Sequence, residues 1–269
     1  MSMVAEFWNE IAGPKWVEQQ VQLDAVMAAH LELLVGAAEL AAGQRVVDVG
    51  CGCGALSLAA ARLGCSVRGV DISRPMLAHA RGRASTESLD IDFAEADAQT
   101  HALPPGTADR LLSRFGVMFF PDAPAAFANL RGWLAPGGEL HFLCWQPLEE
   151  NPWMSKVLDI AEPWLEPQPS APHAPGPFSL GDPERLRAVL GAAGFEDTLV
   201  TDVRLPMSVE GSPEEALRFY LERGPIKSAM SQSDEARAAV REALMALMVA
   251  EHDGEAVSMD GACWLVRAR

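Results

Sequence analysis

The sequence contains no long uninterrupted apolar run, although 49% of its 269 residues are hydrophobic. A helix that crosses a membrane needs about 20 consecutive and mostly apolar residues, so we expect no membrane span. The first residues, Met1–Glu6, also lack the basic segment and apolar stretch that open a secretory signal. We therefore expect a cytoplasmic protein.

Positive charge is scarce as well. Lysine and arginine number 21 against 37 aspartates and glutamates, which gives a formal net charge of -16. Such a chain repels a phosphate backbone and has few cations with which to displace counterions. The composition argues against a nucleic acid as partner or substrate.

The spacings of common metal sites are also missing. The five cysteines are an odd number, and one residue separates Cys51 from Cys53 instead of the two found in usual zinc and redox pairs. No two of the six histidines stand at metal-ligand spacing. We expect reduced thiols and no bound metal.

Short β-branched or apolar runs alternate with helical patterns in the first half of the chain. The expected strands are Arg45–Val49, Ser66–Asp71, Leu111–Phe115 and Glu139–Trp145, and the expected helices are 15–35, Ala55–Leu63, Arg74–Arg83 and one that Asp122 caps. Strands and helices that alternate at this spacing predict parallel pairing with right-handed crossovers. The fold class is therefore α/β, with a doubly wound sheet.

The second half of the chain departs from this alternation. Six prolines between residues 163 and 177 predict a surface loop that also carries His173. Further helices are expected after Asp182 and Ser212 and over Ala236–Ala250, because Asp182 and Ser212 have the features of helix caps. The chain closes on a predicted strand at Ala262–Val266.

A glycine-rich loop, Asp48-Val49-Gly50-Cys51-Gly52-Cys53-Gly54, follows the first strand. Glycines there let the backbone approach a ligand, and an open parallel sheet binds its ligand at this edge. The loop also fits the dinucleotide pattern of NAD-binding folds, as Gly50-x-Gly52-x-x-Ala55, and Asp71, 21 residues after Gly50, could hold an adenosine ribose in either case. Asp48 opposes that interpretation, since its carboxylate would face the NAD pyrophosphate but could accept from the ammonium of a methionine moiety.

These residues resemble the class I S-adenosylmethionine (SAM)-dependent methyltransferase superfamily, and most of all its bacterial small-molecule members similar to ubiquinone and menaquinone C-methyltransferases. The motifs that carry the resemblance are Phe7-Trp8-Asn9, the glycine-rich loop, Val70-Asp71-Ile72-Ser73, Ala96-Asp97-Ala98, Ser113–Phe120 and Leu134-Ala135-Pro136-Gly137-Gly138. The resemblance implies a Rossmann-like, mostly parallel seven-stranded sheet with an antiparallel last strand, an N-terminal helix and helical lid insertions.

The resemblance also implies SAM as cofactor, S-adenosylhomocysteine as its product, and roles for individual residues. The implied cofactor contacts are Asp48, Gly50, Cys51 and Gly52 around the methionine part, Asp71 on the ribose, Ile72 and Met76 against adenine, Asp97 and Ala98 at the adenine edge, Ser113 and Arg114 beside the sulfonium, and Trp16 on a helix over the cofactor. Plainer roles stay open at this stage. Asp71 could cap a helix, Asp97 could serve a turn, and Arg114 could pair with Asp48 or another acid.

The implied domain organisation is an N-terminal helical cap at residues 1–36 and a methyltransferase domain at 37–269, with lid insertions at about 147–181 and 205–258. The expected reaction is methyl transfer to a small apolar or aromatic acceptor through oxygen, carbon or nitrogen, by a monomer or homodimer. The sequence names no catalytic residue. Two alternatives remain: a SAM-binding protein that does not methylate, and an NAD(P)-linked oxidoreductase. The second is remote because the single tyrosine, Tyr220, has no lysine four residues later.

Overall fold

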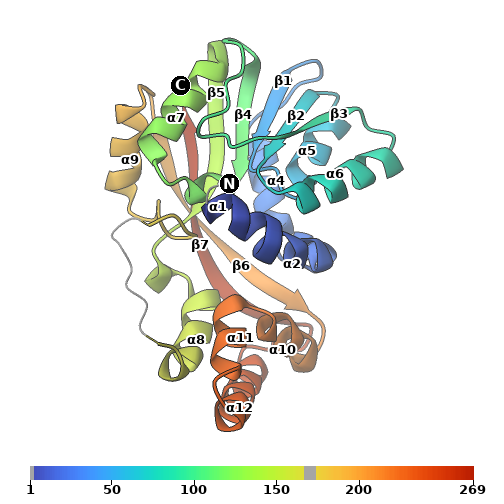
Figure 1. The fold of residues 1–269 in the computed structure, drawn as a ribbon, viewed down its shortest axis with the longest axis vertical. Helices are drawn as coiled ribbons and strands as arrows, with labels where there is room; N and C mark the ends of the chain where they lie inside the picture. Colours follow the sequence, from blue (N-terminus) through green and yellow to red (C-terminus); the bar gives the residue numbers. More distant parts are fainter. Residues whose placement is uncertain (1–2, 167–173) are drawn as a thin grey trace. The chain divides into compact units, whose positions relative to one another are not determined.

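The computed structural model describes residues 3–166 and 174–269, which form one seven-stranded sheet with surrounding helices (Figure 1). The strands are β1 (Arg45–Val49), β2 (Ser66–Asp71), β3 (Ile91–Glu95), β4 (Ala108–Arg114), β5 (Leu134–Trp145), β6 (Leu199–Glu210) and β7 (Ala256–Ala268). Their order across the sheet is β3-β2-β1-β4-β5-β7-β6. Strands β1 to β5 pair in parallel, and β7 pairs antiparallel with β5. The predicted fold class is confirmed.

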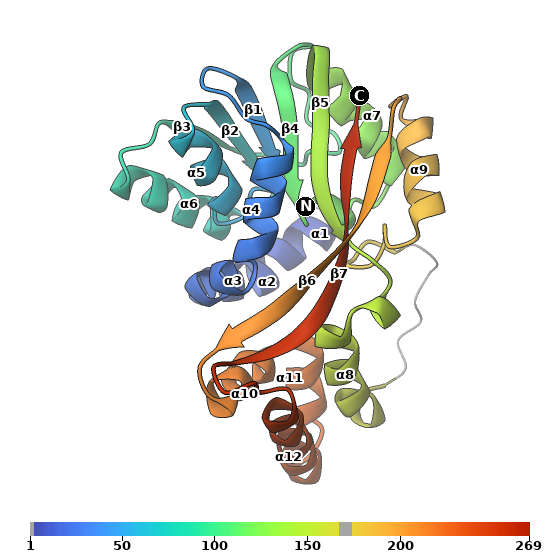
Figure 2. The ribbon, with the colours of Figure 1, turned by 180° about the vertical axis from the view of Figure 1, so that it is seen from behind.

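The helices are α1 (Met3–Glu6), the π-helix η1 (Phe7–Ile11), α2 (Ala12–Glu18), α3 (Gln20–Val26), α4 (Ala28–Ala37), α5 (Ala55–Arg62), α6 (Arg74–Thr86), η2 (Val117–Phe119), α7 (Ala123–Trp133), η3 (Leu148–Glu150), α8 (Pro152–Ala161), η4 (Glu162–Trp164), α9 (Pro183–Ala192), α10 (Pro213–Leu221), α11 (Gly224–Met230) and α12 (Asp234–Ala250). Helices α4, α5 and α6 lie on one face of the parallel strands, and α7 and α9 lie on the other (Figures 1 and 2). None of the described helices is long and apolar enough to cross a membrane.

Coverage on both faces explains why the parallel strands are so apolar. Four of the five residues of β1 are buried, and the last eight residues of β5 are all buried. A hydrophobic cluster lies under α5 and α6 and contains Cys51, Leu58, Leu77, Ala80, Ala84 and Phe93. This packing holds the carboxyl ends of the strands, and the loops that follow them, in fixed positions.

Helix caps that the sequence predicts are present in the structure. The Asp122 side chain accepts from the Ala125 N–H, and Asp182 accepts from two N–H groups at the start of α9. Ser212 and Glu215 form a capping box at the start of α10. These local signals placed the starts of the helices correctly because their partners lie within three residues.

The expectation of one leading helix over 15–35 is wrong. The chain forms three helices there, α2, α3 and α4, which are separated at Gln19 and Met27. Both residues depart from helical geometry, with ψ angles of 9° and 15°. Neither break carries the glycine or proline by which a sequence marks a helix end.

The chain divides into two compact units. The first contains residues 1–145, 173–203 and 263–269, and the second contains 146–172 and 204–262. In the second unit, the fully buried Asn151 donates to the carbonyls of Gln146 and Pro147 and accepts from the Trp153 indole and the Ala262 N–H. The middle of the proline-rich segment, with His173, lies outside the described residues.

Candidate functional site

The glycine-rich loop leaves β1 in a left-handed backbone conformation. Gly50, Gly52 and Gly54 have φ angles of 67°, 55° and 84°, which residues with a Cβ rarely adopt. The N–H groups of Gly50 and Cys51 both donate to the Val70 carbonyl, at 2.8 and 3.2 Å. The loop is thereby fastened to the end of β2.

Asp71, the last residue of β2, links the glycine-rich loop to the next turn. Its Oδ2 accepts from the Gly52 N–H and its Oδ1 accepts from the Ser73 N–H, each at 2.8 Å. Burial raises the pKa of Asp71, and these N–H groups act in the opposite direction by stabilising the carboxylate. Each oxygen keeps a lone pair, so the oriented carboxylate can accept further hydrogen bonds.

Asp48, the fourth residue of β1, is a buried carboxylate that is only half satisfied. It is 1% exposed, and its Oδ2 accepts from the Ser57 hydroxyl at 2.6 Å. Its Oδ1 has no hydrogen-bond partner within residues 3–166 and 174–269. Burial raises the pKa of Asp48 to about 7, although Ser57 and Arg114 favour the charged form. Such a group is matched to a cationic or hydrogen-bond-donating ligand.

The backbone after β4 packs directly on the glycine-rich loop. A Cβ built on Gly50 would lie 2.8 Å from the Gly116 Cα. The buried Ser113 holds this contact in place, because its hydroxyl donates to the Val49 carbonyl at 2.7 Å and accepts from the Gly116 N–H at 3.2 Å. The Ser113 hydroxyl therefore fixes the ends of β1 and β4 relative to each other.

The other predicted cofactor residues differ in how deeply they are buried. The Cys51 side chain belongs to the hydrophobic cluster, and burial raises its pKa well above the usual thiol range, so only the backbone of Cys51 borders the loop surface. Met76 is buried, and its Cε would lie 2.8 Å from a Cβ on Gly52. Asp97 and Ile72 are half-buried, and Asp97 Oδ1 accepts from the Gln99 N–H, as in the turn role that the sequence left open.

The N-terminal helices are tied to the turn after β2. Asn9, in the π-helix, donates to the Ile72 carbonyl at 3.0 Å and accepts from the Arg74 N–H at 2.9 Å. The Ser73 hydroxyl donates to the Trp8 carbonyl at 2.8 Å. π-Helical turns occur often at functional sites, and this one supplies the asparagine that bonds the N-terminal helices to the turn after Asp71.

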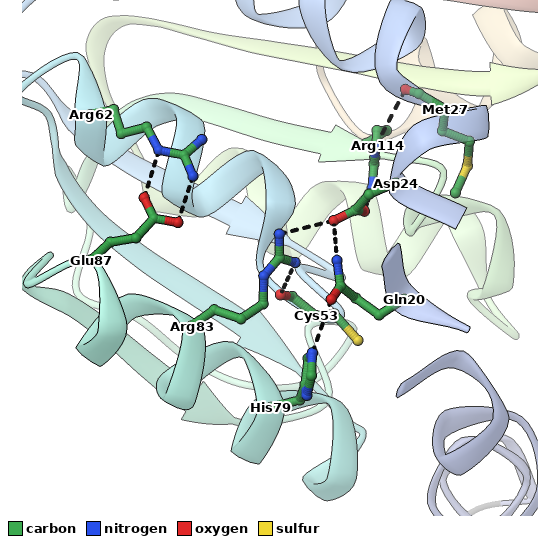
Figure 3. A network of polar contacts seen from close by, with 9 residues as sticks. All are labelled: Gln20, Asp24, Met27, Cys53, Arg62, His79, Arg83, Glu87 and Arg114. Carbon is green, nitrogen blue, oxygen red and sulfur yellow. Dashed lines mark hydrogen bonds and ion pairs between the residues drawn. The ribbon is translucent and has the colours of Figure 1, made fainter. Parts of the chain in front are cut away.

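A charged network fastens α3 to both sides of the glycine-rich loop (Figure 3). The Asp24 carboxylate lies 2.9 Å from the Arg83 guanidinium and 3.2 Å from that of Arg114, and Arg83 also donates to the Cys53 carbonyl at 2.7 Å. Gln20 donates to Asp24, and its other amide atom contacts His79. Arg114 therefore pairs with an acid, but that acid is Asp24 and not Asp48.

Aromatic rings line the N-terminal helices. The Trp8 ring makes edge contacts with Trp16 at 6.0 Å and with Phe119 at 5.1 Å between ring centroids. Phe119 belongs to η2, which follows β4. Trp16 thus lies one ring away from the segment at the end of β4.

Comparison with known proteins gives three findings that bear on the family. A model of the methyltransferase domain matches residues 46–138. An uncharacterized protein of Mycobacterium tuberculosis is 36% identical over 122 residues, which are 45% of this chain and 44% of that protein, so the chain spans less than half of its length. Demethylmenaquinone methyltransferase of Thermus thermophilus is 34% identical over 167 residues, which are 57% of this chain and 75% of that protein. The chain belongs to the class I SAM-dependent methyltransferases.

Solved structures of this methyltransferase family share the fold. Phosphoethanolamine N-methyltransferase 2 of Haemonchus contortus in complex with SAM aligns with a TM-score of 0.61 at 17% identity, over 100% of this chain and 60% of that one. At this identity the comparison supports the architecture alone.

The site residues fit the cofactor of a SAM-dependent methyltransferase. The buried Asp48 offers an unpartnered oxygen to an ammonium group, the glycines let the loop fold closely against Gly116 and Met76, and Asp71 presents an oriented carboxylate. Among residues 3–166 and 174–269, no three His, Cys, Asp or Glu side chains are grouped to hold a metal ion.

Several residues that shape this site received no role from the sequence: Asn9, Asp24, Ser57, Arg83 and Gly116. Asn9 and Gly116 stand inside motifs that carry the resemblance, and Ser57 follows the glycine-rich loop by three residues, so these positions had a weak but usable signal. Asp24 and Arg83 carried no such signal, because ordinary surface charges on helices look the same in sequence.

Proposed function

We propose that the chain binds SAM along the carboxyl ends of β1, β2 and β4 and transfers its methyl group to a small-molecule acceptor. The observation that carries the proposal is the buried Asp48 beside the glycine-rich loop, with one oxygen unpartnered in the described part of the chain. A carboxylate at that position favours an ammonium ligand and disfavours the pyrophosphate of NAD. The NAD(P)-linked alternative is therefore the weaker one.

Individual residues receive the following roles in this proposal. Asp48 accepts from the methionine ammonium, and Asp71 accepts from the ribose hydroxyls. Gly50 and Gly52 border the methionine part. The residues around adenine are Ile72, Met76, Asp97 and Ala98. Ser113 and Arg114 lie beside the sulfonium, and Trp16 lies on a helix over the cofactor.

SAM supplies an activated methyl group on a sulfonium. The chain's own contribution to such a displacement is to position the two reactants and to exclude water. The Asn9 and Asp24 contacts serve that purpose, because they hold the N-terminal helices against the turn after β2 and against the glycine-rich loop. The cap at residues 1–36 and the lid at 147–181 and 205–258 remain predictions, as do a cytoplasmic location and a monomeric or homodimeric state.

Family membership does not set the acceptor. The names of two relatives refer to demethylmenaquinone and phosphoethanolamine, which differ in charge and size. The apolar or aromatic acceptor that the sequence favoured is retained as part of the proposal, and the aromatic rings around Trp8 support it.

The proposal is tested with SAM that carries a tritiated methyl group and a panel of phenols, alcohols and amines. We expect label to pass from SAM to at least one acceptor, and Asp71→Ala to abolish both transfer and SAM binding in calorimetry. Asp71→Asn keeps the side-chain shape and should weaken SAM binding at least tenfold. Unchanged SAM affinity in both variants would refute the site assignment. SAM binding without transfer to any acceptor would favour the non-methylating alternative.

A further inference from the structure

His30, on α4, is a buried imidazole without a polar partner. The side chain is 0% exposed, and neither ring nitrogen has a hydrogen-bond partner in residues 3–166 and 174–269. Buried polar groups in folded proteins are nearly always hydrogen-bonded, and an exception commonly marks a functional position. His30 lies in none of the motifs that carry the family resemblance.

Two aromatic rings surround His30. Phe115 and Trp145 stack with their ring centroids 4.0 Å apart and their planes 9° from parallel. The His30 ring contacts both of them edge-on, at 5.5 and 5.3 Å between centroids. Phe115 directly follows β4 and Trp145 ends β5, so the three rings lie at the carboxyl edge of the sheet, where doubly wound folds bind ligands.

The backbone at Phe115 connects this group to the candidate cofactor site. Phe115 has a φ angle of 63°, an uncommon and strained conformation for a residue with a bulky side chain. The next residue is Gly116, whose backbone packs on Gly50 of the glycine-rich loop. Strained residues occur often at ligand sites, and in this backbone conformation the Phe115 ring contacts His30 and Trp145.

Burial keeps the His30 ring neutral, and a nearby positive charge adds to the effect. Burial and the nearby Arg114 together lower the pKa of His30 to about 4. Arg114 is itself paired with Asp24 on α3. A neutral imidazole has one N–H donor and one bare nitrogen that accepts a hydrogen bond.

We propose that His30 is an acceptor-binding residue of the methyltransferase site, whose bare ring nitrogen accepts a hydrogen bond from the O–H or N–H of the group to be methylated. Phe115 and Trp145 then pack against the apolar frame of the same molecule. The preferred acceptor is a neutral small molecule with a proton-bearing nucleophile on an apolar or aromatic frame. This inference rests on the proposed methyl transfer and specifies which residue selects the acceptor.

A purely structural role for His30 makes a different prediction from this one. Replacement of an unpartnered buried imidazole by a benzene ring removes two unsatisfied nitrogens and keeps the edge contacts with Phe115 and Trp145. If His30 only fills the core, His30→Phe leaves ligand selection unchanged. If His30 binds the acceptor, the same variant stays folded and loses that selection.

Phenol and toluene are suitable probes because they differ by one hydroxyl in place of one methyl. NMR titration of protein saturated with S-adenosylhomocysteine should show wild type binding phenol about tenfold more tightly than toluene, the worth of roughly one hydrogen bond. We expect His30→Phe to lose this preference, with melting temperature not lowered and SAM affinity within twofold of wild type. The control is His101→Phe, because His101 also contacts a tryptophan edge-on, at 6.4 Å from Trp133; this variant should keep the preference.

Equal binding of phenol and toluene by wild type, or an unchanged preference in His30→Phe, overturns the assignment of His30. The titration is repeated without S-adenosylhomocysteine, so it still reports on His30 if the protein fails to bind SAM. Failure of the cofactor assignment and failure of the His30 assignment are thereby separated.

Discussion

Gly50 and Gly116 are in backbone contact. A Cβ on Gly50 would lie 2.8 Å from the Gly116 Cα, and a Cβ on Gly116 would lie 2.7 Å from the Val49 carbonyl oxygen. Both obstacles are backbone atoms, which cannot rotate away as a flexible side chain can. The end of β1 and the segment after β4 can approach this closely only with glycine on both sides, and this approach shapes the floor of the proposed methionine site.

Gly116→Ala should therefore disturb the site and the fold together. We expect a loss of about 1–3 kcal/mol in the free energy of unfolding, because the extra methyl overpacks a tight contact. SAM affinity should fall at least tenfold. Urea unfolding and calorimetry measure the two effects.

The matched control for this variant is Gly82→Ala, in the middle of α6, where a Cβ would meet nothing within 4 Å. A helix-interior glycine that becomes alanine should stabilise the protein by about 0.5–1 kcal/mol and leave SAM affinity unchanged. Equal behaviour of the two variants would contradict the role given to the Gly50–Gly116 contact.

Asp48 should make the protein less stable as pH rises. Burial raises its pKa from 3.8 to about 7 in the folded state, so between these values the folded chain holds a proton that the unfolded chain has released. The stability contributed by this proton is present below about pH 4 and is lost as pH rises to about 7. Asp48→Asn removes the titration, so its stability relative to wild type should increase by roughly 2–3 kcal/mol between pH 5 and pH 8. Parallel stability curves for the two proteins in urea unfolding would contradict the assignment.

The same group should couple SAM binding to pH. An ammonium ligand binds the charged form of Asp48, so SAM affinity should rise as pH increases from 5 to 7.5, and binding below pH 7 should release a proton. Calorimetry in two buffers with different ionisation enthalpies counts the protons. We expect Asp48→Asn to bind SAM more weakly and without this proton release; equal release from both proteins would place the ammonium elsewhere.

Asp24 should stabilise the N-terminal helices far more than an exposed ion pair does. Its side chain is 22% exposed and meets two guanidinium groups that are 23% and 12% exposed. Asp24→Asn should cost about 2 kcal/mol, between the values typical of surface and buried pairs, and should speed hydrogen exchange over residues 3–26. Glu87→Gln breaks the Arg62–Glu87 pair, which Figure 3 also shows and whose side chains are 52% and 34% exposed, and should destabilise the protein less than Asp24→Asn does. Similar exchange rates in both variants would mean that Asp24 does not stabilise the N-terminal helices.

Most of the parallel sheet could be predicted from the sequence, because its signals are local. The run Arg45–Val49 is a strand in both the prediction and the structure, since three of its five residues are valines and a glycine-rich turn follows. The caps at Asp122, Asp182 and Ser212 have partners only two or three residues away. β6 was missed although apolar residues alternate from Val203 to Val209, because Pro206 lies inside the run and a proline argues against a strand; β6 is at the edge of the sheet, where a proline is tolerated.

The candidate site was only partly predictable, for a related reason. Asp48, Asp71 and the glycines stand in motifs whose spacing indicates ligand binding. The Asp24 contacts with Arg83 and Arg114 and the aromatic surroundings of His30 arise only when the chain folds, and they join segments that are distant in the sequence. The helix breaks at Gln19 and Met27 separate α2, α3 and α4, and neither break has a glycine or proline that would mark it in the sequence.

The central claim is that the Asp48, Gly50 and Asp71 site holds SAM, and calorimetric titration of the wild-type chain with SAM and with NAD at pH 7.5 tests it most directly. We predict saturable one-to-one binding of SAM and no measurable binding of NAD. Binding of NAD, or no heat with SAM, would contradict the account.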